Sequence, residues 1–133
     1  MVGVKTPQNS TLRGPRVAFA GYAAVFDRVD RAGDVVRRGA FAGAAVVPLL
    51  LNHAGSPVGE ITVVAEDAYG LRVEGVAAAP VMVGAGLSVG YRARRARQGA
   101  WRELLDCELI EVSLVAVPMQ PLARVDRVGR SGD

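Results

Sequence analysis

One histidine, one serine and one glutamate stand out as residues that could do chemistry, because each lies within an apolar stretch. His53 is the only histidine and ends the run of residues 48–53, where a buried strand would reach the surface. An imidazole titrates near neutral pH and a strand end holds it rigidly, so this position suits a general base. A histidine that merely ends a strand fits the same pattern.

Ser88 lies between Gly86 and Gly90, which would let a backbone or a substrate approach closely. A serine hydroxyl becomes a nucleophile when a neighbouring base takes its proton. The plainer alternative is a small polar residue on a half-exposed strand.

Glu111 shares one strand face with Ser113, while Ile110, Val112 and Leu114 form the opposite, apolar face. A carboxylate in such surroundings needs a hydrogen bond or an ionic partner. It could orient a histidine, as the acid of a serine-protease triad does. It could equally pair with one of the fifteen arginines.

Other reactive residue types have simpler explanations. Asp30 and Asp34 lie four apart around Gly33, and without further ligands at calcium-loop spacing we expect each to cap backbone amides in a turn. Cys107 alternates with leucines and is expected in the core. The sequence has no zinc-ligand set, phosphate loop or dinucleotide fingerprint, so no metal or cofactor is predicted.

The elements that must position these residues are predicted to be strands. The chain has 133 residues, half of them hydrophobic, with 22 valines, 21 alanines and only 5% aromatic residues. Small and β-branched side chains favour strands, and this length suits one domain. No stretch reaches the ~20 apolar residues of a membrane span, and no signal peptide or second cysteine points to secretion.

Alternating and apolar segments predict strands at short intervals, with a polar turn over 27–34 and room for two helical turns over 39–45. The expected strands cover residues 16–26, 46–52, 58–66, 71–77, 87–97 and 101–117. This pattern predicts a mainly β fold, a small antiparallel barrel of about six to seven strands with one or two short helices. The expected domain spans residues 16–126, between a flexible N-terminal arm (1–15) and a C-terminal tail (127–133).

A cluster of arginines could meet phosphate, although the net charge is only +3. A solvated strand-and-turn face is the simpler explanation, and few aromatic residues stand near it for base stacking. A nucleic-acid-binding barrel therefore ranks last among the functions considered. The cluster consists of Arg92, Arg94, Arg95, Arg97 and Arg102.

Four blocks taken in order resemble the prohead (procapsid) serine protease family of tailed bacteriophages, which is related to herpesvirus assemblin. The first block is GYAAVF with VD, GDVV and GAF, within residues 21–41. The second is PLLLNH with PVG, within 48–59. The third is GLSVGY, over 86–91, and the fourth is EVSLV with PM and PLA, within 111–123.

The resemblance implies an assemblin-like barrel fringed by helices and a serine endopeptidase that acts by way of an acyl-enzyme. Its substrate would be the major capsid protein precursor or scaffold segment, inside the assembling procapsid in the bacterial cytoplasm. By position, His53 is the base, Ser88 the nucleophile and Glu111 the orienting acid. The oxyanion would need backbone N–H donors, for which Gly and Arg positions near Arg124 are only candidates. Self-association and self-cleavage are open, and no membrane partner is implied.

One segment departs from the family pattern. Residues 78–85 are too few for the helix that many members carry before the GLSVGY block. The chain therefore resembles a minimal form, as in compact prophages or gene transfer agents. The alternative is a catalytically inactive or structural barrel that serves particle assembly.

Overall fold

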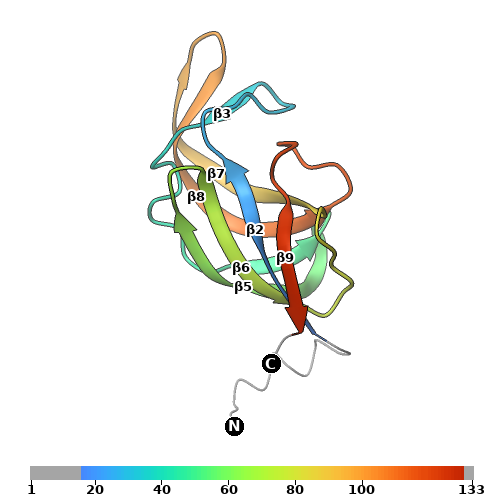
Figure 1. Cartoon of the computed structure of the whole chain (residues 1–133). Coiled ribbons are helices and arrows are strands. Elements are labelled where there is room, and N and C mark those ends of the chain that lie inside the picture. The colour runs from blue at the N-terminus through green and yellow to red at the C-terminus, as the bar shows by residue number, and fades with distance from the viewer. Residues whose placement is uncertain (1–15, 131–133) are drawn as a thin grey trace.

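The computed structural model describes residues 16–130 and consists of strands joined by loops (Figure 1). The expected N-terminal arm, residues 1–15, lies outside the described residues. The strands are β2 (Val17–Val25), β3 (Asp34–Val36), β4 (Pro48–Leu51), β5 (Ala54–Glu66), β6 (Gly70–Ala77), β7 (Gly86–Gln98), β8 (Arg102–Val115) and β9 (Val125–Arg130).

All of the predicted strands are present, and the structure adds β3 and β9. β3 has three residues, which is too short for a periodic signal, and it pairs with the start of β8. The predicted C-terminal tail is wrong for residues 127–130, because these residues belong to β9 and pair with β2. Cross-strand pairing with Phe19 and Ala18 explains why this polar-looking segment is ordered.

The predicted short helices are wrong within residues 16–130, where the structure has no helix. The segment 37–44 instead makes successive tight turns, in which Ala40 N–H donates to Arg37 O at 3.0 Å and Ala44 N–H to Phe41 O at 3.0 Å. Gly39 adopts a positive φ of 94°, which a helix does not allow. Within the same residues, no helix has the length and apolarity to cross a membrane.

The strands form one sheet that is not closed into the predicted barrel. Their order is β3-β8-β4-β5-β6-β2-β9, and β7 pairs with β8 off this path. The start of β7 meets the segment before β9 at one isolated bridge, between Gly86 and Arg124. A few backbone bonds between segments 84–87 and 123–125 join them, rather than a continuous ladder.

The sheet is mixed, not purely antiparallel as predicted. β3 and β4 both run parallel to β8, and they lie one after the other along the same edge of this long strand. β7 runs antiparallel along the other edge of β8. The distal half of this hairpin projects from the rest of the sheet (Figure 1). β8 is therefore the strand around which the candidate site is built.

The core is packed mainly by aliphatic side chains, and all three phenylalanines, Phe19, Phe26 and Phe41, are buried in it. β4, β6, β7 and β8 each contribute residues with no measurable exposure, among them Leu49, Leu71, Leu87 and Val112. Leu49 and Val112 are also register partners between β4 and β8. Apolar packing thus fixes the alignment of the two strands that lead to His53 and Glu111.

Candidate active site

Three neighbouring strands bring together the residues singled out in the sequence. β8 lies in the centre and carries Glu111, while β7 pairs with one of its edges and carries Ser88. β4 pairs with the other edge and leads directly into His53. In the β7–β8 register Ser88 lies opposite Ser113, and Gly90 lies opposite Glu111.

His53 occupies a two-residue turn between β4 and β5, since Leu51 pairs with Ala54 across it. Asn52 and His53 both have positive φ, of 50° and 61°. This is the pattern of a type I′ hairpin turn, which favours asparagine followed by glycine. Asn52 fits that preference, whereas a side chain in place of glycine costs about 1–2 kcal/mol. Strained backbone conformations of this kind are often found at functional sites.

Glu111 pairs with the histidine, not with an arginine. Its Oε2 lies 2.6 Å from His53 Nδ1. Its Oε1 accepts a hydrogen bond of 2.8 Å from Ser113 Oγ. Glu111 is 8% exposed, so a carboxylate there needs such partners. Among residues 16–130 no arginine forms an ion pair with it.

Gly90 makes room for the Glu111 carboxylate. A Cβ at this position would lie 2.0 Å from Glu111 Oε2 and 2.6 Å from its Cδ. Any side chain would therefore push the carboxylate away from His53. The sequence suggested that the glycines beside Ser88 allow a close approach. The group that approaches Gly90 is the Glu111 carboxylate, and only the pairing of β7 with β8 shows this.

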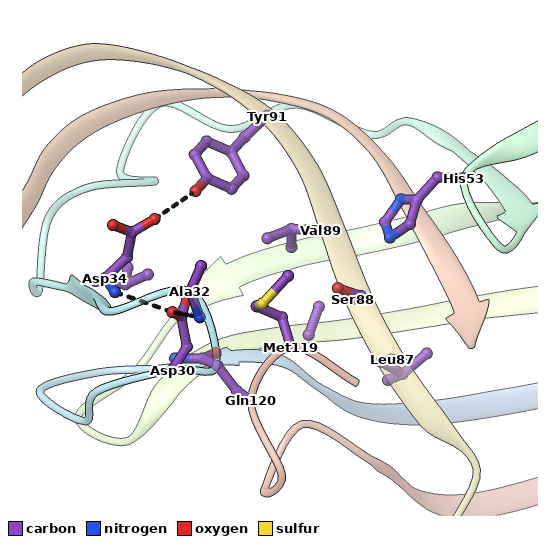
Figure 2. A pocket seen from close by; sticks show the side chains of 12 residues that line it. Asp30, Ala32, Asp34, His53, Leu87, Ser88, Val89, Tyr91, Met119 and Gln120 are labelled. Carbon is purple, nitrogen blue, oxygen red and sulfur yellow. Dashed lines mark hydrogen bonds between the residues drawn. The ribbon is translucent and has the colours of Figure 1, made fainter. Parts of the chain in front are cut away.

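Ser88 and His53 line the same cavity, which has a volume of about 100 Å³ (Figure 2). Ser88 is 7% exposed, while 42% of the His53 side chain is exposed. No hydrogen bond joins Ser88 Oγ to the imidazole in the part of the chain that the structure describes; such bonds are often loose before substrate binds. Other walls of the cavity are mostly apolar, from Ala23, Val36, Leu87, Val89, Tyr91 and Met119.

Two aspartates line the cavity away from Ser88 (Figure 2). Asp30 Oδ1 accepts the N–H groups of Ala32 at 2.8 Å and Asp34 at 2.9 Å, which confirms its predicted turn role. The same prediction is wrong for Asp34, whose carboxylate binds Arg102 through two bonds of 2.9 and 3.0 Å. The Arg102 guanidinium holds the pKa of Asp34 below its usual range.

Arg124 does not line this cavity. Its guanidinium donates to Pro121 O at 2.7 Å and to Gly84 O at 3.0 Å, so it ties two loops together. Met119 and Gln120, from the same loop, are the residues that reach the cavity wall.

Cys107 is buried in the core, as predicted, with 2% of its surface exposed. Burial raises the pKa of its thiol, which disfavours the nucleophilic thiolate.

Four of the five clustered arginines pair with carboxylates, three of them across the β7–β8 hairpin. Arg97 binds Glu103 and Arg94 binds Asp106, while Arg102 binds Asp34. Arg92 likewise contacts Glu108. Arg95 has no carboxylate partner among the described residues. A basic face of this kind offers few free charges to phosphate.

Comparisons with known proteins show the family of the chain. The profile of a protein family described as caudovirus prohead serine protease matches residues 4–133. The chain belongs to this family. The resemblance carried by the four sequence blocks is thereby confirmed. A search of curated protein sequences finds no match for this chain.

A solved structure of another protein has a fold similar to that of this chain. The chain is similar to KSHV protease, which was crystallised in complex with a hexapeptide phosphonate inhibitor, with a TM-score of 0.60 and 13% identity. The similarity covers 86% of this chain and 65% of the KSHV protease chain. The predicted assemblin-like fold is confirmed by this match, even though the sheet is not closed.

Proposed function

We propose that this chain is a serine endopeptidase that cleaves the major capsid protein precursor, or its scaffold segment, during procapsid maturation. One observation carries the proposal: the 2.6 Å contact between His53 Nδ1 and Glu111 Oε2, beside the cavity that His53 shares with Ser88. Membership of the prohead serine protease family supports the substrate class. In this proposal the chain works inside the procapsid in the bacterial cytoplasm, as a minimal form from a compact prophage or a gene transfer agent.

The three side chains have complementary roles in peptide hydrolysis. Ser88 Oγ attacks the carbonyl carbon while its proton passes to His53 Nε2. The ionised Glu111 accepts the Nδ1–H bond and stabilises the imidazolium that forms. The imidazolium then gives its proton to the leaving amine nitrogen, the C–N bond breaks, and an acyl-enzyme remains. A water molecule then attacks the acyl carbon while His53 takes its proton. The ester C–O bond breaks, the new carboxyl terminus leaves, and the proton passes from His53 to Ser88 Oγ.

The open edge of β7 supports binding of an extended peptide. Leu87 N–H is bonded at the outer edge to Ala123 O, at 2.9 Å. The backbone N–H and C=O groups of alternate residues face the same edge of a strand, so the groups of Val89 face the outer edge as those of Leu87 do. At Val89 this edge is no longer covered by the segment 123–125. A substrate strand that pairs with Val89 would pass next to Ser88.

Coexpression with the major capsid precursor tests the proposal. Ser88→Ala and His53→Ala should each abolish processing, since loss of a triad nucleophile or base costs several powers of ten in rate. Thr62→Ala is the matched control, because it removes an exposed hydroxyl on β5. Processing of the precursor at the wild-type rate by either site variant would show that the mechanism is wrong.

A structural role in particle assembly is the second candidate. It is favoured by the short loop 78–85 and by the lack of a hydrogen bond from Ser88 to His53 within the described residues. A serine-reactive phosphonate should label Ser88 in an active protease. An unlabelled chain that is incorporated stably into particles would favour the structural role instead.

A further inference from the structure

Ser113 lies where the proposed base and acid meet. Its side chain is fully buried on β8, opposite Ser88 in the β7–β8 register. Its Oγ donates a hydrogen bond of 2.8 Å to Glu111 Oε1 and accepts one of 2.9 Å from the backbone N–H of His53. One hydroxyl thus contacts both residues whose relative position decides the orientation of the imidazole.

The two contacts fix the direction in which the hydroxyl proton of Ser113 points. A serine has a single proton to donate, and here it goes to the carboxylate. With Oε1 held in this way, Oε2 of Glu111 is the oxygen that faces His53 Nδ1, at 2.6 Å. The other contact holds the backbone of His53, which has an unfavourable φ of 61°.

The turn has a second bond to β8 that does not involve this hydroxyl. Asn52 N–H donates to Leu114 O at 3.0 Å, so a backbone bond already ties the turn to β8. A buried hydroxyl needs hydrogen-bond partners, and those of Ser113 are Glu111 and the backbone of His53. The position of Ser113 is therefore better explained by the orientation of Glu111 and His53 than by the stability of the sheet.

We propose that Ser113 is a positioning residue that keeps the imidazole of His53 in the form with its proton on Nδ1. In this form Nδ1–H donates to Glu111, and Nε2 is left free to accept the proton of Ser88. The effect on the imidazole is a property of the fold, whereas the effect on the rate rests on the proposed protease function.

The single histidine of the chain makes the proposal directly measurable. In protein labelled with ¹⁵N histidine, the two ring nitrogens have different shifts when the proton stays on one of them. At about pH 8.5, where an ordinary imidazole is neutral, the wild type should show the Nδ1–H form. Ser113→Ala should give a mixture of both tautomers, and Ser113→Thr, which keeps the hydroxyl, should restore the wild-type spectrum.

Cys107→Ala is the matched control for loss of stability. It removes a buried side-chain atom from the same strand without touching Glu111 or His53. This variant should be destabilised and keep the wild-type imidazole spectrum. An unchanged spectrum in Ser113→Ala would overturn the proposal, and so would a mixture of tautomers in the wild type.

Cleavage of the capsid precursor gives a second readout. Ser113→Ala should lower kcat by about 10–100-fold with KM unchanged, because a base displaced by a fraction of an ångström is slower although substrate binding is intact. If Ser113→Ala changes the imidazole spectrum while Ser88→Ala still cleaves, the positioning role holds and the protease function is wrong. If Ser88→Ala is inactive but Ser113→Ala matches the wild type in both readouts, the positioning role is wrong.

Discussion

At the scale of single residues, the turn at His53 holds a residue that the proposed reaction needs and that the backbone conformation disfavours. Its positive φ suits glycine, yet the proposed reaction needs an imidazole. His53→Gly and His53→Ala both delete the ring, so they differ in how well the backbone tolerates this conformation, against the larger entropy that glycine loses on folding.

We expect His53→Gly to be more stable than His53→Ala by about 1 kcal/mol, because glycine has no Cβ to clash in the left-handed region. Urea unfolding of the two variants measures the difference. An alanine variant that equals or exceeds the glycine variant in stability would show that the turn is not strained. Both variants should have lost cleavage of the capsid precursor.

Gly90 gives a second prediction at this scale. Gly90→Ala places a Cβ 2.0 Å from the present site of Glu111 Oε2, so the carboxylate must turn away from His53. A misplacement of about 1 Å can cost on the order of 100-fold in rate, and we expect a loss of that size in kcat.

Gly129→Ala is the matched control, because this strand glycine has open space where a Cβ would lie. Cleavage rates and the ¹⁵N spectrum of His53 check the prediction. Wild-type kinetics in Gly90→Ala would mean that Glu111 does not need its present position.

At the scale of elements, the pair of Arg102 with Asp34 ties β8 to β3 beside the cavity. The Asp34 side chain is 8% exposed, and both of its oxygens bind the guanidinium. Because Arg102 holds the pKa of Asp34 below its usual range, the folded state favours the carboxylate. The stabilisation is fully present above the ordinary aspartate pKa of about 4 and disappears as pH falls through the lower folded value.

Asp34→Asn should therefore lower the free energy of unfolding by about 1 kcal/mol near pH 7, and the gap to wild type should shrink below about pH 4. Denaturation curves from pH 7 down to about pH 3 test this. Asp106→Asn, which breaks an exposed pair between β7 and β8, should have a smaller effect at neutral pH. A gap that stays constant with pH would contradict the role of the Asp34 charge.

The strands show which elements local sequence patterns can predict and which they cannot. β2, β5, β6, β7 and β8 were predictable because each is long enough to show alternation or a continuous apolar run. β3 and β9 were not, since three residues carry no period and Val125–Arg130 looks polar on its own. The parallel pairing of β4 with β8 was equally hidden, because no local signal links segments so far apart.

At the scale of the whole molecule, charge bears on the nucleic-acid alternative. The net charge of +3 includes arginines that already bind carboxylates across the β7–β8 hairpin. Releasing DNA counterions requires free cationic groups, so we expect binding no tighter than non-specific affinities of about 10⁻⁴–10⁻⁶ M at physiological salt.

Fluorescence anisotropy with a labelled DNA duplex measures this affinity over a salt series. Tight binding that weakens steeply with salt would revive the nucleic-acid function. Arg95→Ala, which removes the cluster's arginine without a carboxylate partner among the described residues, should then reduce it most.

Residue types and short blocks were enough to predict a mainly β chain of this family and to single out Ser88, His53 and Glu111. This is possible because apolar alternation and small motifs are local properties of the chain. The tertiary structure decided what those residues touch. His53 and Glu111 are 58 residues apart, and they meet only because β4 pairs in register with β8. The space at Gly90, the contacts of Ser113 and the open sheet follow from the same long-range pairing, which depends on how distant strands pack rather than on the sequence of any one segment.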